Sequence, residues 1–275
     1  MLYLAASVAI PIVGIGVYLK FFRSSKRPNY PKDIVYAHIG PRGPYAPSLS
    51  PFAIKLELFM KITNIEYEGE LHDIVMSSKG KFPWISYNED DVTDSQFSIE
   101  YMKRKFKVDL DHDYTPAELA IGRAMQKMAE ENLYWCLVLE RWVYQKIPKL
   151  WTISKIPQHV IWIVKKGQIK NAYGQGMGRH TEEEVFDIAR RDLKALSDFL
   201  GDKKFLLGDK ITEFDCAIFG LLCQIYYHSM DGCLNAYMTK ELKNLCDYVL
   251  RVKETFWPDW NECVQIQDHS GKKTN

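Results

Sequence analysis

Apolar and polar positions divide the chain into a front region of short alternating runs and a longer region of helical spacing. The front region covers residues 33–106 and contains the β-rich runs DIVYAHI, IEYEGEL, PWISYN and DDVT. Between and after them lie two amphipathic runs, PFAIKLELFMKIT and SQFSIEYMKRKF. The economical order is strand, helix, strand, strand, strand, helix, so the front region is predicted to be an α/β unit.

From Tyr114 onward the chain has helical spacing almost throughout. TPAE at 115–118 is a capping box with proline at the first helical position, and it opens a run that reaches about Tyr144. TEEE at 181–184 begins a second helix, for which Gly201 is the expected C-cap. This region is therefore predicted to be all-helical.

A third helix start predicts the centre of the helical region. In TEFD at 212–215, Thr212 can cap the helix, Asp215 can answer from the third position, and Ile211 can pack on Cys216. The following run, AIFGLLCQIYY, is apolar on every side. Such a helix is expected in the middle of a bundle.

The first residues form an uncharged apolar run, Leu2 to Leu19, that would extend about 27 Å as a helix, close to the thickness of a bilayer core. Five basic residues follow it within the next stretch: Lys20, Arg23, Lys26, Arg27 and Lys32. The positive-inside rule then leaves the large C-terminal body facing the cytoplasm. The alternative is a cleaved signal peptide, although basic residues before the run and a small-residue cleavage site after it are not evident.

Composition and charge narrow the function. The chain is 47% hydrophobic and 26% charged, and 36 basic against 35 acidic residues give a net charge of +1, so electrostatics do not favour a nucleic-acid partner. The domain plan is a membrane anchor (1–20), a basic linker (21–32), the α/β domain (33–110), the helical domain (111–263) and a disordered tail (264–275). Each domain is expected to have its own core.

The cysteines indicate a reducing environment and no metal site. The six cysteines all follow residue 135 and lack the dense spacing of a disulfide framework, and the chain has no Asn-x-Ser/Thr acceptor. No CxxC or CxxH pair is present to form a compact tetrahedral site. We therefore expect buried structural cysteines and no metal.

Several stretches give the chain a specific resemblance over residues 33–260. They are SLSPFAIKLELF, GKFPWISYN, DVTDSQFSIEYM, GQGMGRHTEEE and GDKITEFDCAIFG. The chain resembles the glutathione transferase superfamily, and within it the failed axon connections group with its cadmium-responsive and metaxin-like relatives. The resemblance implies a thioredoxin-like N-terminal domain, a helical glutathione transferase C-terminal domain, glutathione as ligand or cosubstrate with no permanently bound cofactor, and a homodimer.

The resemblance also assigns binding residues. Pro83, preceded by Phe82, matches the cis-proline turn that exposes backbone groups to a peptide-like ligand; the alternative is an ordinary trans-proline entering an edge strand. Asp94 and Ser95 match the pair that holds the γ-glutamyl end of glutathione. Asp94 can equally be the N-cap of the helix that begins at Ser95, and the two roles are compatible.

Ser50 is the candidate catalytic residue. Ser50-Pro51-Phe52-Ala53 occupies the place of a Cys-Pro-x-Cys motif, and the loss of both cysteines excludes dithiol exchange. A hydroxyl at a helix N-terminus can still lower the pKa of a bound thiol. The competing interpretation is that Ser50 only caps a helix with proline at N1. Arg42 and Tyr45, in the preceding loop, are further candidates.

Two functions follow from these residues. The favoured one is a membrane-anchored glutathione transferase-like protein in a stress response to cadmium or xenobiotics, or in cellular organisation, with weak or no catalysis. The alternative is an active serine-type transferase that conjugates glutathione to electrophiles. A small electrophile or a protein is the expected partner, and endolysosomal and mitochondrial outer membranes are both candidate locations.

Overall fold

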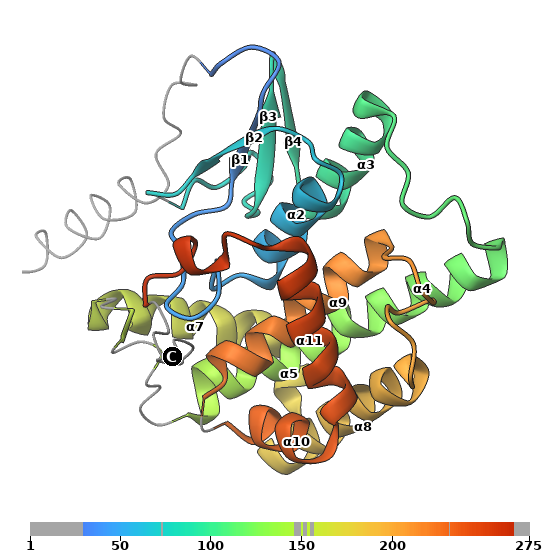
Figure 1. Cartoon of the computed structure of the whole chain (residues 1–275). Helices are drawn as coiled ribbons and strands as arrows, with labels where there is room; N and C mark the ends of the chain where they lie inside the picture. Colours follow the sequence, from blue (N-terminus) through green and yellow to red (C-terminus); the bar gives the residue numbers. More distant parts are fainter. Residues whose placement is uncertain are drawn as a thin grey trace, which may run out of the picture.

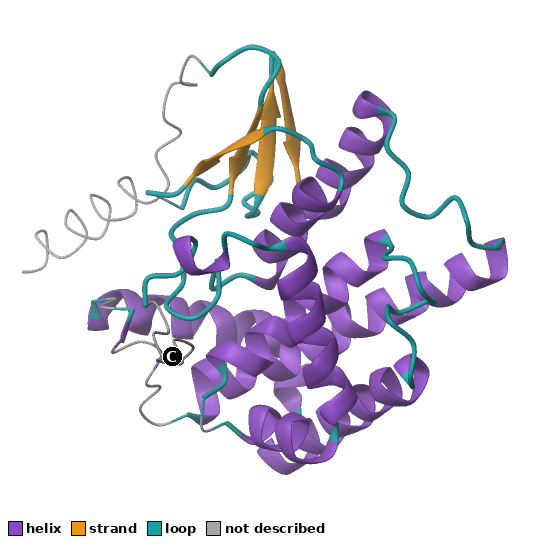
Figure 2. Cartoon of the chain, in the orientation of Figure 1, coloured by secondary structure: helices purple, strands orange, loops and turns teal. Residues whose placement is uncertain are grey.

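The computed structural model describes residues 30–72, 74–145, 150, 153–154, 157–230 and 232–266. A small sheet stands at one end of the molecule, and helices make up the remainder (Figure 1, Figure 2). The predicted anchor at residues 2–19 lies outside the described residues, as do 21–29 of the linker and 267–275 of the tail. No helix within the described part of the chain has the length and apolarity needed to cross a membrane.

The front region contains the predicted strands and helices in the predicted order. They are β1 (Val35–His38), α2 (Pro51–Ile62), β2 (Tyr67–Glu70), β3 (Trp84–Tyr87), β4 (Asp90–Thr93) and α3 (Ser95–Phe106). The sheet order is β2-β1-β3-β4, with β1 parallel to β2 and both other pairs antiparallel. Because side chains alternate along β3, Ile85 and Tyr87 point to the face where α2 and α3 pack, and Trp84 points to the other face.

The helical region follows the predicted starts. Its elements are α4 (Pro116–Met128), η1 (Ala129–Leu133), α5 (Tyr134–Leu139), η2 (Glu140–Tyr144), α7 (Gln158–Gln175), η3 (Met177–Arg179), α8 (Glu182–Leu200), α9 (Glu213–Cys223), η4 (Gln224–His228), α10 (Cys233–Glu241), α11 (Lys243–Phe256) and η5 (Trp260–Glu262). Thr115 and Thr181 form capping boxes with Glu118 and Glu184, and Gly201 is the C-cap of α8 at a φ of 51°. The run predicted as one helix to Tyr144 contains two π-helical segments, η1 and η2.

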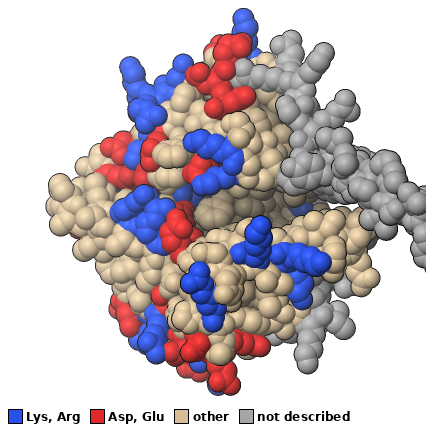
Figure 3. All heavy atoms as spheres, turned by 180° about the vertical axis from the view of Figure 1, so that it is seen from behind, with Lys and Arg blue, Asp and Glu red and all other residues tan. Residues whose placement is uncertain are grey.

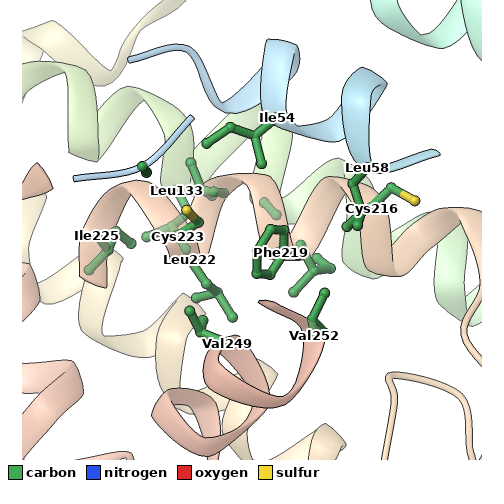
Figure 4. Close-up of a cluster of buried hydrophobic side chains, with 14 of the residues drawn as sticks. Ile54, Leu58, Leu133, Cys216, Phe219, Leu222, Cys223, Ile225, Val249 and Val252 are labelled. Carbon is green, nitrogen blue, oxygen red and sulfur yellow. The ribbon is translucent and has the colours of Figure 1, made fainter. Parts of the chain in front are cut away.

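Helix α9 is the centre of the molecule, as its apolar sequence predicts. In Figure 4 it lies between Ile54 and Leu58 of α2 on one side and Val249 and Val252 of α11 on the other. A Cβ at Gly220 would lie 2.4 Å from the Pro51 carbonyl oxygen, so glycine is required for α9 to reach the first turn of α2. The prediction of separate cores is wrong: one continuous cluster of buried side chains joins the two regions.

The predicted disorder of the tail is wrong for its first residues. The Gln265 N–H donates to the Gly43 carbonyl at 2.9 Å, and the Ile266 N–H donates to the Pro44 carbonyl at 3.0 Å. The Gln265 side chain also donates to the Arg42 carbonyl at 2.6 Å. These backbone partners explain why a polar sequence is ordered here, and they attach the end of the described chain to the loop before α2.

Candidate functional site

The sheet register gathers the predicted site residues at one end. Trp84 pairs with Thr93 and His38 pairs with Trp84, so the same registers place Pro83 opposite Asp94 and Ile39. The Phe82–Pro83 peptide bond is cis, as predicted. The loop from β1 to α2 leaves this end of the sheet, and α3 begins here. The N-termini of α2 and α3 therefore belong to the same end of the sheet as Pro83.

Ser50 is the N-cap of α2, and Pro51 is at the first helical position. The Ser50 hydroxyl oxygen accepts from the Ala53 N–H at 3.3 Å, and the Ser50 N–H donates to the Ser48 hydroxyl at 3.1 Å. Ser50 is half-buried. The cap uses the hydroxyl as an acceptor, whereas activation of a thiol would use its O–H as a donor, so capping does not consume the group that chemistry needs.

Asp94 caps α3 and is held in an ion pair. Its carboxylate accepts from the Gln96 N–H at 3.0 Å and from Lys81 Nζ at 2.7 Å. Partial burial opposes the charged form, but these two partners outweigh it and hold the pKa of Asp94 below its ordinary value. Its φ of 84° is unusual for a residue other than glycine, and such strain is concentrated at ligand sites. The neighbouring Ser95 is buried, and Phe82 is half-buried.

Three buried polar side chains of the helical region hold the loop before Ser50. Arg141 donates to the Leu49 carbonyl at 2.9 Å and to the Gln224 side chain at 2.8 Å. Gln224 in turn donates to the Ser48 carbonyl at 2.8 Å. His228 Nε2 accepts from the N–H groups of Tyr45 and Ala46 at 3.3 and 3.2 Å. The loop that delivers Ser50 is thus fixed by groups more than ninety residues away in the chain.

Sequence reasoning missed these three residues. Gln224 and His228 follow a fully apolar helix, and a buried polar group in such a run needs a specific partner. Two polar residues directly after an apolar helix could therefore have indicated a buried hydrogen-bond partner. A single sequence does not reveal that this partner is the loop near residue 48. Burial places the pKa of His228 well below its ordinary value, with the nearby Arg141 adding to the effect, so the ring is neutral and accepts at Nε2 while Nδ1 donates to Gln224 at 3.1 Å.

Structural roles account for Arg42 and Tyr45 in this loop and for Trp84 at the start of β3. Arg42 makes a two-pronged ion pair with the buried Glu57 at 2.6 and 2.8 Å, so its guanidinium is directed at α2. Tyr45 lies beside His228, with ring centroids 6.5 Å apart. Trp84 stacks on His38 at 3.6 Å and donates to the Val75 carbonyl at 2.8 Å, on the sheet face opposite α2. The ring of Trp84 therefore points away from the helices that carry Ser50 and Ser95.

A cavity lies where α2 meets the helical region. It is small and partly open to solvent, and it is lined by Pro51, Phe52, Lys55, Glu130, Tyr134, Ala217 and Leu221. Phe52 and Tyr134 meet edge to face across it at 5.0 Å. None of the five predicted ligand residues lines this cavity, which instead adjoins Ser50 through Pro51. Viewed from behind, the molecule also has a hollow between its upper and lower ends (Figure 3).

A buried polar network forms the floor of this cavity. Lys55, 1% exposed, donates to Glu130 at 2.6 Å and to the Gln96 side chain at 2.7 Å. Gln126 donates to the same Gln96 oxygen at 2.8 Å. Because Gln96 is in the first turn of α3, the network connects the beginnings of both site helices to η1. It fixes the position of the α3 N-terminus relative to α2.

The cysteines are distant from this chemistry. All six are free, and five of them are buried, as expected of structural cysteines. Burial also disfavours the thiolate, and it raises the pKa of Cys136 to about 12. The prediction is wrong for Cys233, which is exposed at the start of α10. Among the described residues, no group of His, Cys, Asp and Glu is arranged to hold a metal ion.

Two buried neutral histidines predict a loss of stability in mild acid. Burial lowers the pKa of His38 to about 4 and places that of His228 well below 6.5. The unfolded chain therefore binds protons below pH 6.5 that the folded chain does not, and stability falls as pH drops through that range. Between pH 7 and pH 5 we expect each histidine to lower the free energy of unfolding by about 2 kcal/mol.

Urea denaturation at both pH values measures this effect. His228→Gln should flatten the pH dependence, because an amide oxygen can still accept from the loop but does not titrate in this range. His159→Gln, at an exposed position of α7, is the matched control for the substitution itself. Equal pH dependence in wild type and His228→Gln would contradict the assignment of His228 as a neutral acceptor.

The comparisons with known proteins show the family. A model of the glutathione S-transferase N-terminal domain matches residues 51–147, and a model of the C-terminal domain matches residues 189–252. The isoprene-epoxide–glutathione S-transferase of Rhodococcus sp. (strain AD45) is 32% identical over 236 residues, which cover 81% of this chain and 98% of that protein. The chain belongs to the glutathione S-transferase superfamily.

Relatives in the superfamily place the chain with its metaxin-like members. Failed axon connections of Drosophila melanogaster is 30% identical over 260 residues, 86% of this chain, and the chain spans 62% of that protein's length. Metaxin-1 of Sus scrofa is 25% identical over 228 residues, which cover 75% of this chain and 71% of metaxin-1. The predicted resemblance to the failed axon connections and metaxin-like group is confirmed.

Solved structures confirm the predicted thioredoxin-like and helical transferase fold. The β-etherase LigF of Sphingobium sp. strain SYK-6 superposes with a TM-score of 0.56 at 17% identity, over 80% of this chain and 94% of that one. A Tau class glutathione S-transferase of Mangifera indica gives a TM-score of 0.58 at 14% identity, over 86% of this chain and 95% of that one. At such identities the likeness concerns the fold alone.

Proposed function

We propose that this chain binds glutathione where α2 and α3 begin, and that it acts as a stress-response or cellular-organisation factor with weak or no catalysis. Ser50 would face the thiol, the backbone at Phe82 and Pro83 would meet the peptide, and Asp94 with Ser95 would hold the γ-glutamyl end. Residues 2–19 would anchor the protein in a membrane, with the body toward the cytoplasm. The observation that carries the proposal is the register that gathers these residues at one end of the sheet.

Electrostatics at this end favour an anionic ligand. The free N–H groups of a helix N-terminus attract negative charge. Here the beginnings of α2 and α3 are joined by the hydrogen bond from Lys55 to Gln96 at 2.7 Å. One can face the thiolate of glutathione and the other its γ-glutamyl carboxylate. Asp94, however, is already engaged by Lys81, so a ligand amine must share or replace that ion pair. This competition is our reason for expecting modest affinity.

Ser50 sets the upper limit on catalysis. A cysteine-like thiol has a pKa near 8.5, and lowering it by one to two units requires about 1.4 to 2.8 kcal/mol. One hydroxyl donor and one helix N-terminus can supply that amount. Ser50 cannot form a disulfide, and Ala53 offers no second sulfur. The site is therefore suited to assist a bound thiol and unsuited to redox exchange.

The alternative is an active serine-type transferase that conjugates glutathione to electrophiles. The observation in its favour is the 32% identity to an isoprene-epoxide–glutathione S-transferase over nearly that enzyme's whole length. The small cavity beside Pro51, lined by Phe52 and Tyr134, would have to widen to admit an apolar electrophile beside a thiol held at Ser50. In this alternative the chain would use an epoxide or a similar electrophile near the membrane.

Calorimetric titration of the full-length protein with glutathione, together with turnover of a generic aromatic electrophile, tests both functions. We expect saturable binding with little turnover. In the alternative, Ser50→Ala would lower turnover about tenfold, because the hydroxyl and the helix N-terminus together supply one to two units of thiol pKa and only the helix N-terminus remains. Absence of binding by the folded wild-type protein would overturn both functions.

Two further variants separate chemistry from capping at Ser50. Ser50→Gly lacks the hydroxyl but costs α2 only a few tenths of a kcal/mol, whereas Ser50→Ala costs about 1 kcal/mol as a lost cap. Ser50→Thr keeps both the hydroxyl and the cap. If turnover follows the hydroxyl, Ser50→Gly is as impaired as Ser50→Ala; if it follows stability, Ser50→Gly resembles the wild type.

Sedimentation of the full-length protein in detergent tests the proposed homodimer.

A further inference from the structure

Helix α7 is the least buried long helix of the described chain. Of its 18 residues only Ala172 is buried. It packs against α5, η2 and η3 through one narrow side, and in Figure 1 it lies at the margin of the helical region. A helix that contributes so little to the core would be expected to carry polar residues on its free side.

The free side of α7 instead carries large apolar side chains. Trp162 is 58% exposed, Ile163 51%, Ile169 42% and Tyr173 59%. Trp162, Ile169 and Tyr173 are separated by seven and four residues, which places them on one stripe of the helix at 100° per residue. Four of the eight exposed large hydrophobic residues in the described chain belong to this one helix.

The charged side chains of α7 are all basic. Between residues 141 and 181 the sequence contains no Asp or Glu, although the whole chain has nearly equal numbers of acids and bases. The described basic residues of this stretch that are not buried are Lys165, Lys166 and Lys170 on α7 and Arg179 in η3. Over the remainder of the surface seen from behind, basic and acidic side chains are interspersed (Figure 3). The acid-free stretch therefore favours a negatively charged partner.

Basic groups and aromatic rings are combined within the stripe. Lys166 Nζ lies 3.7 Å from the centroid of the Trp162 ring, and the Arg179 guanidinium lies 5.1 Å from that of Tyr173. Aromatic rings flanked by long basic side chains are enriched at the boundary between lipid headgroups and hydrocarbon, where the ring is immersed and the cation reaches the phosphates.

We propose that the exposed side of α7 lies flat on an anionic membrane surface. Trp162, Ile169 and Tyr173 would enter the headgroup boundary while Lys165, Lys166 and Lys170 meet lipid phosphates and carboxylates. A second copy of the chain is a poor occupant, because a two-fold interface would set the lysines of α7 against one another. The contact is separate from the glutathione site and does not depend on glutathione binding.

Lipid-depth quenching on the full-length protein tests the contact. The protein is reconstituted into phosphatidylcholine vesicles with or without about a third phosphatidylserine, and brominated lipids quench tryptophans that reach the headgroup boundary. Subtracting the signal of Trp162→Phe isolates Trp162. We expect strong lipid quenching of Trp162 in the vesicles with phosphatidylserine and weak quenching without it. Equal quenching of wild type and Trp162→Phe in all vesicles would overturn the proposal.

A matched pair of double variants tests the role of charge. Lys166→Glu with Lys170→Glu should lower the ratio of docked to undocked helix about thirtyfold or more, since each lysine near an anionic surface contributes about a fivefold factor. Lys240→Glu with Lys243→Glu makes the same change in net charge at exposed positions on α10 and α11 and should leave Trp162 quenching intact. Equal loss in both pairs would also overturn it.

Aqueous quenching identifies a different occupant. In the proposed state, acrylamide reaches Trp162 poorly and brominated lipid reaches it well. If Trp162 is protected from acrylamide but is not quenched by lipid, a protein surface covers α7, and the membrane proposal is wrong. Protection that increases with protein concentration would then identify a second copy as the occupant.

Discussion

Asp215→Ala is expected to lower the free energy of unfolding by about 3 to 5 kcal/mol and to leave little folded protein at 37 °C. The Asp215 carboxylate is fully buried in the first turn of α9. It accepts from Thr212 N–H and Oγ1 at 2.8 and 2.7 Å, from the Leu206 N–H at 2.8 Å and from the Tyr248 hydroxyl at 2.9 Å. Alanine would leave three buried donors without a partner, whereas the Tyr248 hydroxyl could still donate to the backbone carbonyl of residue 215, 3.3 Å away.

Urea unfolding of the full-length protein, followed by circular dichroism, measures the loss. Tyr248→Phe is the matched control, because it removes one donor and keeps the carboxylate satisfied by the other three; we expect it to cost about 1 kcal/mol. A native domain has only about 5 to 15 kcal/mol of stability, so the two variants should differ visibly in expression as well. An unfolding midpoint for Asp215→Ala equal to that of Tyr248→Phe would contradict the central role of the carboxylate.

The start of α9 shows what a sequence makes visible. The spacing of Thr212 and Asp215 is local, and it predicted the helix start correctly. The two donors from Leu206 and Tyr248 were not predictable, because one comes from a preceding loop and the other from a helix that packs only in the folded state. Local capping rules therefore found the helix, while the reason why Asp215 is so deeply buried belongs to tertiary structure.

The same division holds for the candidate site. The motif around Ser50, the cis bond at Pro83 and the cap at Asp94 all follow from short stretches and family resemblance. The hold on the loop by Arg141, Gln224 and His228 depends on chain segments far apart, and so does the attachment of Gln265. Sequence reasoning thus gave the residues that we propose to face a ligand and missed those that hold the loop before Ser50 in place.

Helix α2 gives the clearest case of a misleading pattern. By sequence its charged residues should lie on a solvated face, yet Lys55 and Glu57 are 1% and 0% exposed. Each is buried because a partner arrives from another element, Glu130 from η1 and Arg42 from the loop before α2. The π-helical turn of η1 adds a residue to the helical repeat between α4 and α5. It thereby alters which side chains of the run from α4 to η2 face α2.

Lys55→Met should destabilise the protein by about 3 kcal/mol, because the Glu130 carboxylate, 8% exposed, loses its buried cation and keeps only the more exposed Lys127, 3.3 Å away. The double variant Lys55→Met with Glu130→Leu should recover most of that loss, since an apolar pair of similar volume can replace a buried ion pair at little cost. Urea unfolding of the wild type, both single variants and the double variant gives the coupling energy. Equal losses in Lys55→Met and the double variant would show that packing of the lysine chain, and not charge, is what matters.

The pH dependence of the free energy of unfolding of the same variants supplies a second test. In the wild type, burial alone would raise the pKa of Glu130, but Lys55 and Gln126 outweigh it and hold that pKa below its ordinary value. A depressed folded pKa means that Glu130 stabilises the protein above pH 4.5 and that this contribution is lost as pH falls. Without Lys55, burial prevails and the folded pKa rises, so the deficit of Lys55→Met relative to the wild type should shrink as pH falls toward 4. A deficit that stays constant between pH 7 and pH 4 would mean that Glu130 does not carry a charge that Lys55 neutralises, and the polar connection between α2, α3 and η1 would then rest on the glutamines alone.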